Sequence, residues 1–357
     1  MPRRIAVAVS GGVDSLTAAF LLKRQGWDVV GIHFLSGYPK PARSTSGAAP
    51  SSLGATDRLV KMGDVLGFPV HVIDCRKLFQ KRVVDYFVRS YRRGRTPNPC
   101  MVCNPVVKFG RLLSAARGLG AERLATGHYA RSLRDGKGWV HLHRGKDPAK
   151  EQSYFLGFLT QRQLQRAEFP LGEWKKTDVV RLAEENGIVP VSAGESQDVC
   201  FIAGGSCGDF LAAQSGDVPE SGPIEDTAGR TIGVHPGLHR FTVGQRRGIN
   251  CPGPEPYYVI RLDAERNRLV VGHREALFAD GCPLSGVRWT TKPPLGPLRV
   301  CVRIRYRSRE VPATVLPARH SEASLRFDRP QAAVAPGQAA VFYCGTEVIG
   351  AGWIEPI

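Results

Sequence analysis

Short apolar runs alternate with longer segments of helical periodicity over the first half of the chain. The apolar runs predict strands at residues 4–10, 27–35, 69–75 and 123–130. Apolar positions that recur every three or four residues predict helices at residues 13–26, 57–68, 77–94, 107–120 and 176–187. Because strands alternating with helices of this length form βαβ units, the pattern predicts an α/β fold on a parallel sheet. Ligands bind such sheets beyond the carboxyl ends of the strands.

The pattern changes after about residue 204, where glycine, proline and short alternating runs become common. Residues 257–273 predict a hairpin that turns near residues 265–267, and residues 299–316 and 338–354 predict further strands. We therefore expect three domains. They are a catalytic domain at 1–204, a small β-rich central domain at 205–274, and a C-terminal β-barrel at 275–357.

One stretch of the first half fits neither period. Residues 36–56 are rich in Ser, Gly, Ala and Pro and have no apolar periodicity. Such a length without secondary structure is unusual inside a compact domain, so a mobile flap or disorder is expected here.

Charge narrows the range of partners. The 357 residues include 49 Lys+Arg against 32 Asp+Glu, a net charge of +17. That excess favours a polyanionic partner, nucleic acid first and an anionic membrane second. No apolar run approaches the roughly 18 residues that a spanning helix needs, and nine scattered cysteines fit a reducing compartment. We expect a cytoplasmic protein with no membrane partner.

The hexapeptide SGGVDS, residues 10–15, stands where the first strand passes into the first helix. Its two glycines allow backbone N–H groups to approach a phosphate, and the helix N-terminus favours an anion. The hydroxyls of Ser10 and Ser15 can bind the same oxygens, and Asp14 can cap the helix or hold Mg²⁺. The pattern is neither a Walker loop nor the dinucleotide GxGxxG pattern. The alternative is a capped helix start after a tight turn.

Two cysteines lie three residues apart in RTPNPCMVCN, residues 95–104. On their own, Cys100 and Cys103 fit half of a zinc site, a redox pair or a nucleophile. A third cysteine, Cys200, stands in the stretch SQDVCFI. The other six are expected to be ordinary packing residues: Cys75, Cys207, Cys251, Cys282, Cys301 and Cys344.

These stretches together resemble one family. SGGVDS is similar to the PP-loop of ATP pyrophosphatases, which have an adenine nucleotide alpha hydrolase-like fold, cleave ATP to AMP and pyrophosphate, and adenylate a carbonyl oxygen. The order and spacing of further stretches resemble tRNA-specific 2-thiouridylases, at residues 94–104, 125–130, 150–156, 194–202, 237–249, 305–307 and 335–343. The resemblance covers nearly the whole chain, which is identified as a member of that family.

The resemblance implies ATP-dependent 2-thiolation of the wobble uridine of tRNA. The uracil C2 oxygen is a poor leaving group, and adenylation converts it into AMP, which leaves readily once sulfur attacks. The implied cofactors are ATP and Mg²⁺. The implied partners are a tRNA with a wobble uridine and a sulfur donor, either a cysteine desulfurase, a sulfur-relay protein or sulfide.

The resemblance also assigns site residues. Cys200 is the persulfide carrier and Cys103 its catalytic partner. The implied ATP-binding residues are Ala8, Val9, Ser10, Gly11, Gly12, Val13, Asp14, Ser15, Phe34 and Gly127. The residues implied at the target base are Asn98, Pro99 and Cys100. The implied tRNA contacts are His128, Lys150, Glu151, Gln152, Arg305, Tyr306 and Gln338.

Three of these positions depart from the family pattern. Cys100 replaces an aspartate proposed as an acid–base group, Phe34 replaces a methionine at the adenine, and Glu151 replaces an aspartate. Because of the first change, Cys100, Cys103 and Cys200 could hold a [4Fe–4S] cluster with one open iron, an alternative to the persulfide. Zinc is a third alternative, with His141 and His143 as further ligands.

Arginines alternate with apolar residues in VCVRIRYRSR, residues 300–309. Period two predicts a strand with one basic face, so Arg305 and Tyr306 point to opposite faces unless the strand ends there. Another basic stretch, residues 89–95, leads to the target-base segment, and phosphate contacts there make binding salt-dependent.

Two other functions remain open. A PP-loop ligase acting on a small molecule leaves Cys103 and Cys200 unused. A non-catalytic RNA-binding protein leaves SGGVDS unexplained.

Overall fold

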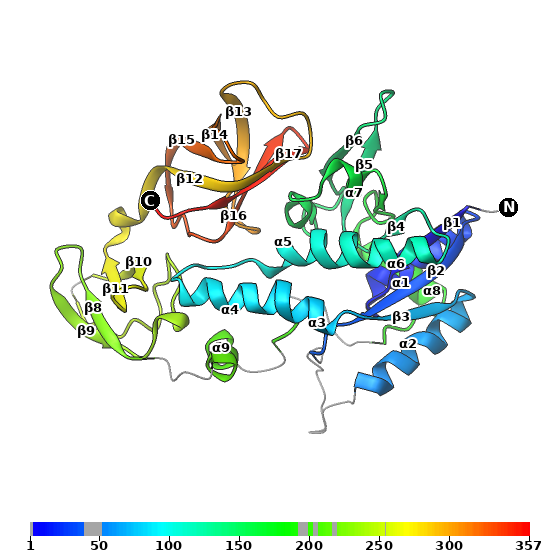
Figure 1. The fold of residues 1–357 in the computed structure, drawn as a ribbon, viewed down its shortest axis with the longest axis horizontal. Helices are drawn as coiled ribbons and strands as arrows, with labels where there is room; N and C mark the ends of the chain where they lie inside the picture. Colours follow the sequence, from blue (N-terminus) through cyan, green and yellow to red (C-terminus); the bar gives the residue numbers. More distant parts are fainter. Residues whose placement is uncertain (1–2, 39–51, 192–198, 203–205, 216–219, 254) are drawn as a thin grey trace. The chain divides into compact units, whose positions relative to one another are not determined.

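A computed structural model describes residues 3–38, 52–191, 199–202, 206–215, 220–253 and 255–357. Figure 1 shows the helices and strands of the chain. The chain forms two compact units. The first unit comprises Met1–Val83, Cys100–Gly204 and Thr346–Ile349. The second unit comprises Val84–Pro99, Gly205–Gly345 and Gly350–Ile357. The predicted boundaries at residues 204 and 274 stay a prediction.

The first unit is built on a five-stranded sheet in the order β3-β2-β1-β4-β7. Its strands are β1 (Arg4–Ala8), β2 (Asp28–Leu35), β3 (Val70–Asp74), β4 (Leu124–Ala125) and β7 (Ala167–Glu168). Every pair of neighbours is parallel, which confirms the α/β parallel-sheet prediction. The fourth strand is shorter than predicted: β4 ends at Ala125, and residues 126–129 are not part of a strand.

The first unit also contains helices and short helical turns. They are α1 (Val13–Arg24), α2 (Ser52–Leu66), α3 (Arg76–Phe79), η1 (Gln80–Val84), α5 (Pro99–Cys103), η2 (Asn104–Leu112), α6 (Leu113–Gly118), η3 (Ser153–Leu156), α7 (Gln161–Leu164) and α8 (Lys176–Glu185). The core packs Leu16 and Leu22 of α1 against Ile5 and Val7 of β1. Fully burying an aliphatic side chain contributes about 1.5–3 kcal/mol, so this interface anchors α1 on the sheet.

Two predictions for helical segments need correction. The second helix begins at Ser52, so residues 52–56 of the expected flap are helical, and residues 39–51 lie outside the described residues. Helical structure also begins at Pro99, eight residues before the predicted start at 107. Proline suits the first helical position because its missing N–H has no intrahelical partner there. Cys100 and Cys103 therefore lie on a helix.

The first unit also contains an antiparallel hairpin of β5 (Ala130–Arg134) and β6 (Val140–Arg144). Glu347 and Val348, at the start of β17 (Glu347–Ile354), pair with His143 and Leu142 of β6.

A four-stranded sheet in the order β10-β11-β8-β9 forms one part of the second unit. Its elements and neighbours are α4 (Asp85–Arg92), α9 (Cys207–Ser215), β8 (Gly222–Glu225), β9 (Thr231–His235), η4 (Leu238–Arg240), β10 (Tyr258–Asp263), β11 (Arg268–Gly272) and η5 (Arg274–Leu277). The predicted hairpin at residues 257–273 is confirmed, and Asn267 adopts a left-handed φ of 48° at its turn. The helix α9 was not predicted.

A six-stranded barrel forms the other part of the second unit. Its strands are β12 (Phe278–Trp289), β13 (Leu298–Arg303), β14 (Val311–Pro317), β15 (Ala323–Ala332), β16 (Ala339–Cys344) and β17. The strand β12 pairs with both β15 and β17, which closes the barrel as predicted. Closure removes the exposed sheet edges that invite aggregation. No helix among the described residues is long and apolar enough to cross a membrane.

Candidate active site

The loop between β1 and α1 has the geometry of an anion-binding turn. Gly11 adopts a φ of 84°, a left-handed conformation that favours glycine. The Ser15 hydroxyl donates to the carbonyl of Gly12 at 3.0 Å and accepts from the backbone N–H of Ser10 at 3.0 Å. The hydroxyls of Ser10 and Ser15 lie 3.3 Å apart. The two hydroxyls and the N-terminus of α1 thus converge on the space in which a phosphate would bind.

Asp14 in the first turn of α1 has two donors. The Lys176 ammonium donates to Asp14 Oδ1 at 2.6 Å, and the Tyr129 hydroxyl donates to the same oxygen at 2.8 Å. Lys176 is only 13% exposed and begins α8, while Tyr129 follows β4. Three segments far apart in the sequence therefore meet at one carboxylate oxygen.

Gly127 lies against the backbone of the same loop. A Cβ at this position would come within 2.9 Å of the Asp14 carbonyl carbon and of the Ser15 nitrogen. Real Cβ atoms essentially never approach backbone this closely, so a glycine is required for the contact.

Gln152 fixes Tyr129 from the other side. The side-chain oxygen of Gln152 accepts from the Tyr129 N–H at 3.1 Å, and the backbone N–H of Gln152 donates to the Tyr129 carbonyl at 2.9 Å. Glu151 is 5% exposed and accepts a hydrogen bond from the Ser153 N–H, whereas Lys150 is half-buried. Glu151 and Gln152 thus bind other parts of the protein. The RNA contacts expected of Lys150, Glu151 and Gln152 stay predictions.

His128 is buried and contacts Lys108 of η2, the element that follows Cys103. Burial, aided by the nearby Lys108 ammonium, holds the pKa of His128 well below its usual value, so the ring is neutral. The ammonium has no acceptor, so Lys108 donates to His128 Nε2 at 3.3 Å. The proton of the ring then lies on Nδ1, which donates to the Thr126 hydroxyl at 2.7 Å.

Lys108 belongs to η2, a π-helix that directly follows Cys103. A π-helix hydrogen-bonds residues five apart, so it aligns positions at the spacing of Cys103 and Lys108. π-helical turns are frequent at functional sites.

The two cysteines of RTPNPCMVCN have weakly acidic thiols. Burial raises the pKa of Cys103 to about 12 and that of Cys100 to about 11. The charge of Lys108 opposes this rise at both thiols, whereas Cys200 adds to it at both. Cys75 also acts on Cys103 and is itself buried, as expected of a packing residue. Cys100, Cys103 and Cys200 therefore lie in one electrostatic neighbourhood.

Cys200 is exposed, but the residue after it is firmly anchored. Phe201 is 2% exposed and its ring packs 5.8 Å from those of Tyr38 and Phe79. Upstream, the Val191 N–H donates at 2.8 Å to the carbonyl of Gly11, which belongs to the loop of residues 10–15, called the nucleotide loop below. Residues 194–198 of the expected motif lie outside the described residues.

Phe34 lies near the carboxyl end of β2 and is partly buried. Its ring centroid lies 6.1 Å from that of Phe79, in the aromatic cluster that anchors Phe201. Its contact with adenine stays a prediction.

The described residues show no preformed metal site. Among the described residues, no group of three or more His, Cys, Asp or Glu side chains is arranged to hold a metal ion. Cys100, Cys103 and Cys200 therefore do not form a ready cluster site in this conformation. All nine cysteines are free thiols.

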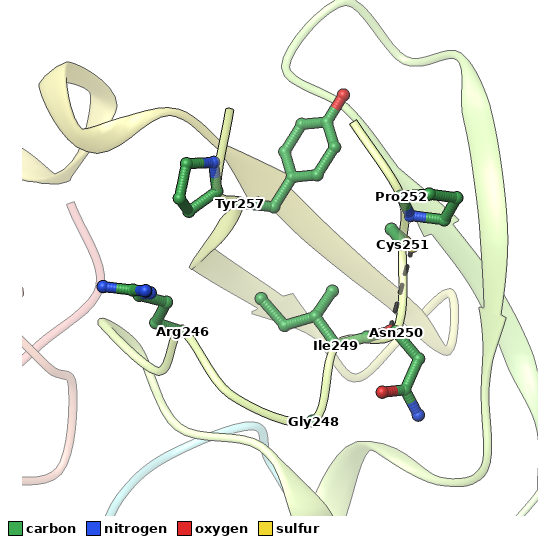
Figure 2. Close-up of a pocket in the computed structure, with 8 residues that line it drawn as sticks. Arg246, Gly248, Ile249, Asn250, Cys251, Pro252 and Tyr257 are labelled. Carbon is green, nitrogen blue, oxygen red and sulfur yellow. Dashed lines mark hydrogen bonds between the residues drawn. The ribbon is translucent and has the colours of Figure 1, made fainter. Parts of the chain in front are cut away.

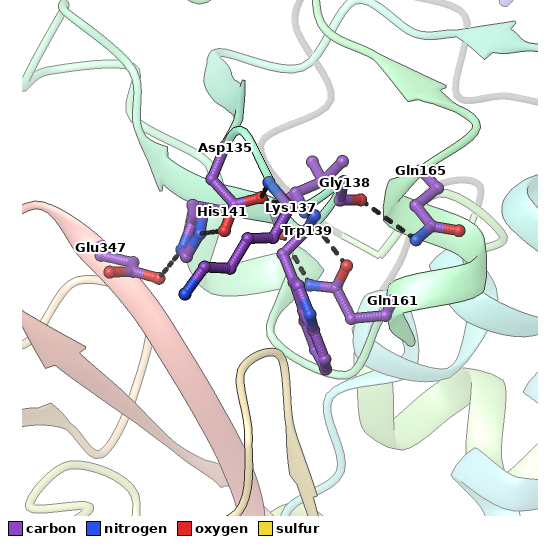
Figure 3. A network of polar contacts seen from close by, with 9 residues as sticks. Asp135, Lys137, Gly138, Trp139, His141, Gln161, Gln165 and Glu347 are labelled. Carbon is purple, nitrogen blue, oxygen red and sulfur yellow. Dashed lines mark hydrogen bonds and ion pairs between the residues drawn. The ribbon is translucent and has the colours of Figure 1, made fainter.

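The histidines considered as zinc ligands are occupied otherwise. His141 Nδ1 lies 2.6 Å from Glu347 Oε1 and its Nε2 lies 3.5 Å from Asp135 Oδ2 (Figure 3). His143 contacts the Thr346 hydroxyl at 3.0 Å. These contacts join the β5–β6 hairpin to residues 346 and 347, so the two histidines have a structural role.

In the second unit, the basic strand ends earlier than predicted. The strand β13 stops at Arg303, whose guanidinium pairs with Glu310 at 2.9 Å and lies 5.4 Å from the Tyr343 ring centroid. Arg305 and Tyr306 follow in a turn, so the alternation of strand faces does not apply to them. Arg305 is exposed and Tyr306 is partly buried.

Gln338 supports the backbone near the expected target-base residues. Its amide donates to the Thr96 carbonyl at 2.9 Å, and the Thr96 N–H donates to Pro336 at 2.8 Å. Asn98 is partly buried and Pro99 is buried. The RNA contact of Gln338 and the base contacts of Asn98, Pro99 and Cys100 stay predictions.

A cavity of about 400 Å³ lies elsewhere in the second unit (Figure 2). It is lined by Arg246, Gly248, Ile249, Asn250, Cys251, Pro252, Pro256 and Tyr257. None of the residues expected at the active site lines it.

Three family models match consecutive parts of the chain. The tRNA methyl transferase HUP domain matches residues 3–204, its PRC-barrel domain residues 208–273, and the aminomethyltransferase beta-barrel domain residues 279–354. The tRNA-specific 2-thiouridylase MnmA of Desulfosudis oleivorans is 53% identical over 98% of this chain and 94% of its own. The chain belongs to the tRNA-specific 2-thiouridylase family.

Other 2-thiouridylases match equally fully. The MnmA of Geobacter metallireducens is 44% identical over 99% of this chain and 97% of its own. Among solved structures, a 4-thiouridine synthetase–RNA complex with bound ATP has a TM-score of 0.35 and 20% identity, covering 56% of this chain and 45% of that one.

The sequence analysis did not single out three residues that contact the candidate site. They are Lys108, Tyr129 and Lys176, whose partners lie between 20 and 162 residues away. Tyr129 lies within the stretch of residues 125–130, but periodicity gave no signal for the two lysines. Cys344, expected to be a packing residue, is instead exposed.

Proposed function

We propose that this protein 2-thiolates the wobble uridine of tRNA at the expense of ATP. One observation supports this most strongly. The first unit contains both the nucleotide loop at residues 10–15 and the thiols Cys103 and Cys200, with Val191 hydrogen-bonded to Gly11 on the way to Cys200. Membership of the 2-thiouridylase family over the whole chain agrees with this arrangement.

The first half-reaction activates the base. The uracil C2 oxygen attacks the α-phosphorus of ATP, pyrophosphate leaves, and the oxygen becomes part of an AMP leaving group. Ser10, Ser15 and the N-terminus of α1 would bind phosphate oxygens. The Asp14 carboxylate suits Mg²⁺, which proteins hold with one or two carboxylates and substrate phosphates, and the ion would neutralise phosphate charge.

The second half-reaction delivers sulfur from a persulfide on Cys200. The Cys103 thiolate attacks Cys200 Sγ, which forms a Cys103–Cys200 disulfide and releases hydrosulfide. The hydrosulfide attacks C2 and expels AMP with the original oxygen. The sulfur gains the two electrons that the two thiols lose, so a dithiol reductant must then reduce the disulfide.

The remaining assignments concern partners and domains. A persulfide-bearing donor, such as a cysteine desulfurase or relay protein, would load Cys200, and the tRNA substrate implies the cytoplasm. The three-domain division at residues 1–204, 205–274 and 275–357 is supported by the matched ranges 3–204, 208–273 and 279–354. The exposed Arg305 is a candidate for phosphate contact.

Two measurements test this function. Purified protein with ATP should release pyrophosphate only when tRNA containing a wobble uridine is added. The tRNA of a deletion strain should lack wobble 2-thiouridine in nucleoside analysis. An unchanged 2-thiouridine content would refute the function. Pyrophosphate release with a free amine and no RNA would instead indicate a small-molecule ligase.

A further inference from the structure

Lys176 is an unusual lysine for its position. It is the first residue of α8, and its side chain is 13% exposed. A cation at a helix N-terminus is disfavoured because the helix dipole places positive charge there. Burial also disfavours an ammonium ion unless it is paired. The stability of α8 therefore does not explain why a lysine occupies this site.

The position of Lys176 is fixed from its backbone. Its N–H donates to Asp147 Oδ2 at 2.8 Å, and Asp147 Oδ1 also accepts from the Ala149 N–H at 2.9 Å. The side chain then extends to α1, where the ammonium meets Asp14 Oδ1. The N-termini of α1 and α8 thus approach the same carboxylate.

Asp14 can give up this partner without becoming isolated. The Tyr129 hydroxyl donates to Oδ1 as well. Oδ2 has no hydrogen-bond partner among the described residues, and the carboxylate is 33% exposed. It is therefore accessible to a second cation from solvent.

We propose that Lys176 leaves Asp14 when ATP binds and contacts the phosphates beside the loop of residues 10–15. This inference rests on the proposed function, since it concerns the ATP site of the thiolation reaction. The ammonium already contacts Asp14, which belongs to the same turn as Ser10 and Ser15. In the free protein Asp14 keeps the lysine desolvated and oriented, and Lys176 supplies positive charge where pyrophosphate departs.

The test compares Lys176→Met with Lys176→Arg and with Lys175→Met. Lys175 is the adjacent, exposed lysine, so its variant is a matched control. Binding of α,β-methylene-ATP and of adenosine is measured by calorimetry, with thermal melting as a check on folding. Loss of one charge-assisted hydrogen bond predicts about 10- to 100-fold weaker binding of the triphosphate in Lys176→Met. Adenosine binding stays within twofold, Lys176→Arg is intermediate, and Lys175→Met equals wild type.

Two results would overturn the inference. Unchanged triphosphate binding in Lys176→Met means that the lysine does not touch phosphate. Equal losses for the triphosphate and adenosine mean that Lys176 only maintains the fold. A wild-type protein that binds the triphosphate but releases no pyrophosphate with tRNA would count against the proposed function instead, and would leave the assignment of Lys176 standing on the binding data.

Discussion

The hydroxyl of Tyr129 donates a hydrogen bond of 2.8 Å to the carboxylate of Asp14. This contact connects the segment that follows β4 to the nucleotide loop. Because Gln152 holds the backbone of Tyr129 through two hydrogen bonds, the stretch expected to meet tRNA is linked to the loop expected to meet ATP. Asp14 is thus joined through Tyr129 to the segment that contains Gln152.

Tyr129→Phe removes this hydrogen bond and leaves the ring in place. A net hydrogen bond contributes about 0.5–1.5 kcal/mol, so we expect ATP binding to weaken by roughly two- to tenfold. Calorimetric titration with α,β-methylene-ATP measures the change, and tRNA affinity by filter binding serves as the internal control. A variant with unchanged nucleotide affinity would mean that the Asp14 contact has no role in ATP binding.

Gly127→Ala places a methyl group 2.9 Å from backbone atoms of Asp14 and Ser15. The loop or the β4 segment must move, and we expect at least a tenfold loss of ATP affinity and of pyrophosphate release, a cost of about 1.4 kcal/mol or more. Gly118→Ala is the matched control, because its added Cβ meets nothing within 4 Å. Equal activity of the two variants would contradict the close approach of Gly127 to the loop.

The raised thiol pKa values predict how sulfur release depends on pH. With the pKa of Cys103 at about 12 because of burial, only a small fraction of this thiol is ionised at pH 7. The thiolate fraction rises about tenfold for each pH unit below the pKa, so the single-turnover rate from preloaded persulfide rises steeply between pH 7 and 9. A flat profile would show that Cys103 ionisation does not limit the step.

Lys108→Met tests whether the charge of Lys108 lowers the pKa of the Cys103 thiol. The Lys108 ammonium favours the Cys103 thiolate, so its loss should raise the thiol pKa further and slow alkylation of Cys103 at pH 8. Lys108→Arg preserves the charge and is the control. Mass spectrometry after timed alkylation follows Cys103 separately from the exposed Cys200.

Cys100→Asp introduces the carboxylate that the family pattern has at this position. If sulfur passes through a persulfide on Cys200, this variant keeps thiolation activity, whereas Cys103→Ser and Cys200→Ser abolish it. Thiolation of tRNA is measured by nucleoside analysis. Complete inactivity of Cys100→Asp, together with iron in anaerobically purified wild-type protein, would indicate that a [4Fe–4S] cluster delivers the sulfur and that a persulfide does not.

Periodicity predicted the elements whose pattern is local. The strands β1, β2 and β3 and the helices α1 and α8 follow from apolar runs and spacing within short segments, and β1, β2, α1 and α8 contribute buried residues to one core. The helix α9 was missed because its apolar residues form no single stripe. The early end of β13 was missed because Arg303 pairs with Glu310 after a turn that the alternation of residues 300–309 does not reveal.

Local sequence patterns likewise indicated some residues of the candidate site and not others. Short sequence motifs indicated the loop of residues 10–15, Gly127, Cys103 and Cys200. Lys176 lies 162 residues from Asp14, and Lys108 lies 20 residues from His128. Contacts of this kind depend on where separate segments pack, which local sequence patterns do not encode. The sequence also did not indicate that Glu151 is buried and accepts a hydrogen bond from the Ser153 N–H, while its RNA contact stays a prediction.

The central claim is that ATP and the cysteines act in turn on one uracil oxygen, and an isotope can follow that atom. Transfer RNA labelled with ¹⁸O at the C2 oxygen of its wobble uridine is thiolated in a single turnover, and the AMP is analysed by mass spectrometry. The account predicts one ¹⁸O in each AMP formed per 2-thiouridine. Unlabelled AMP, with the isotope recovered in water, would contradict it.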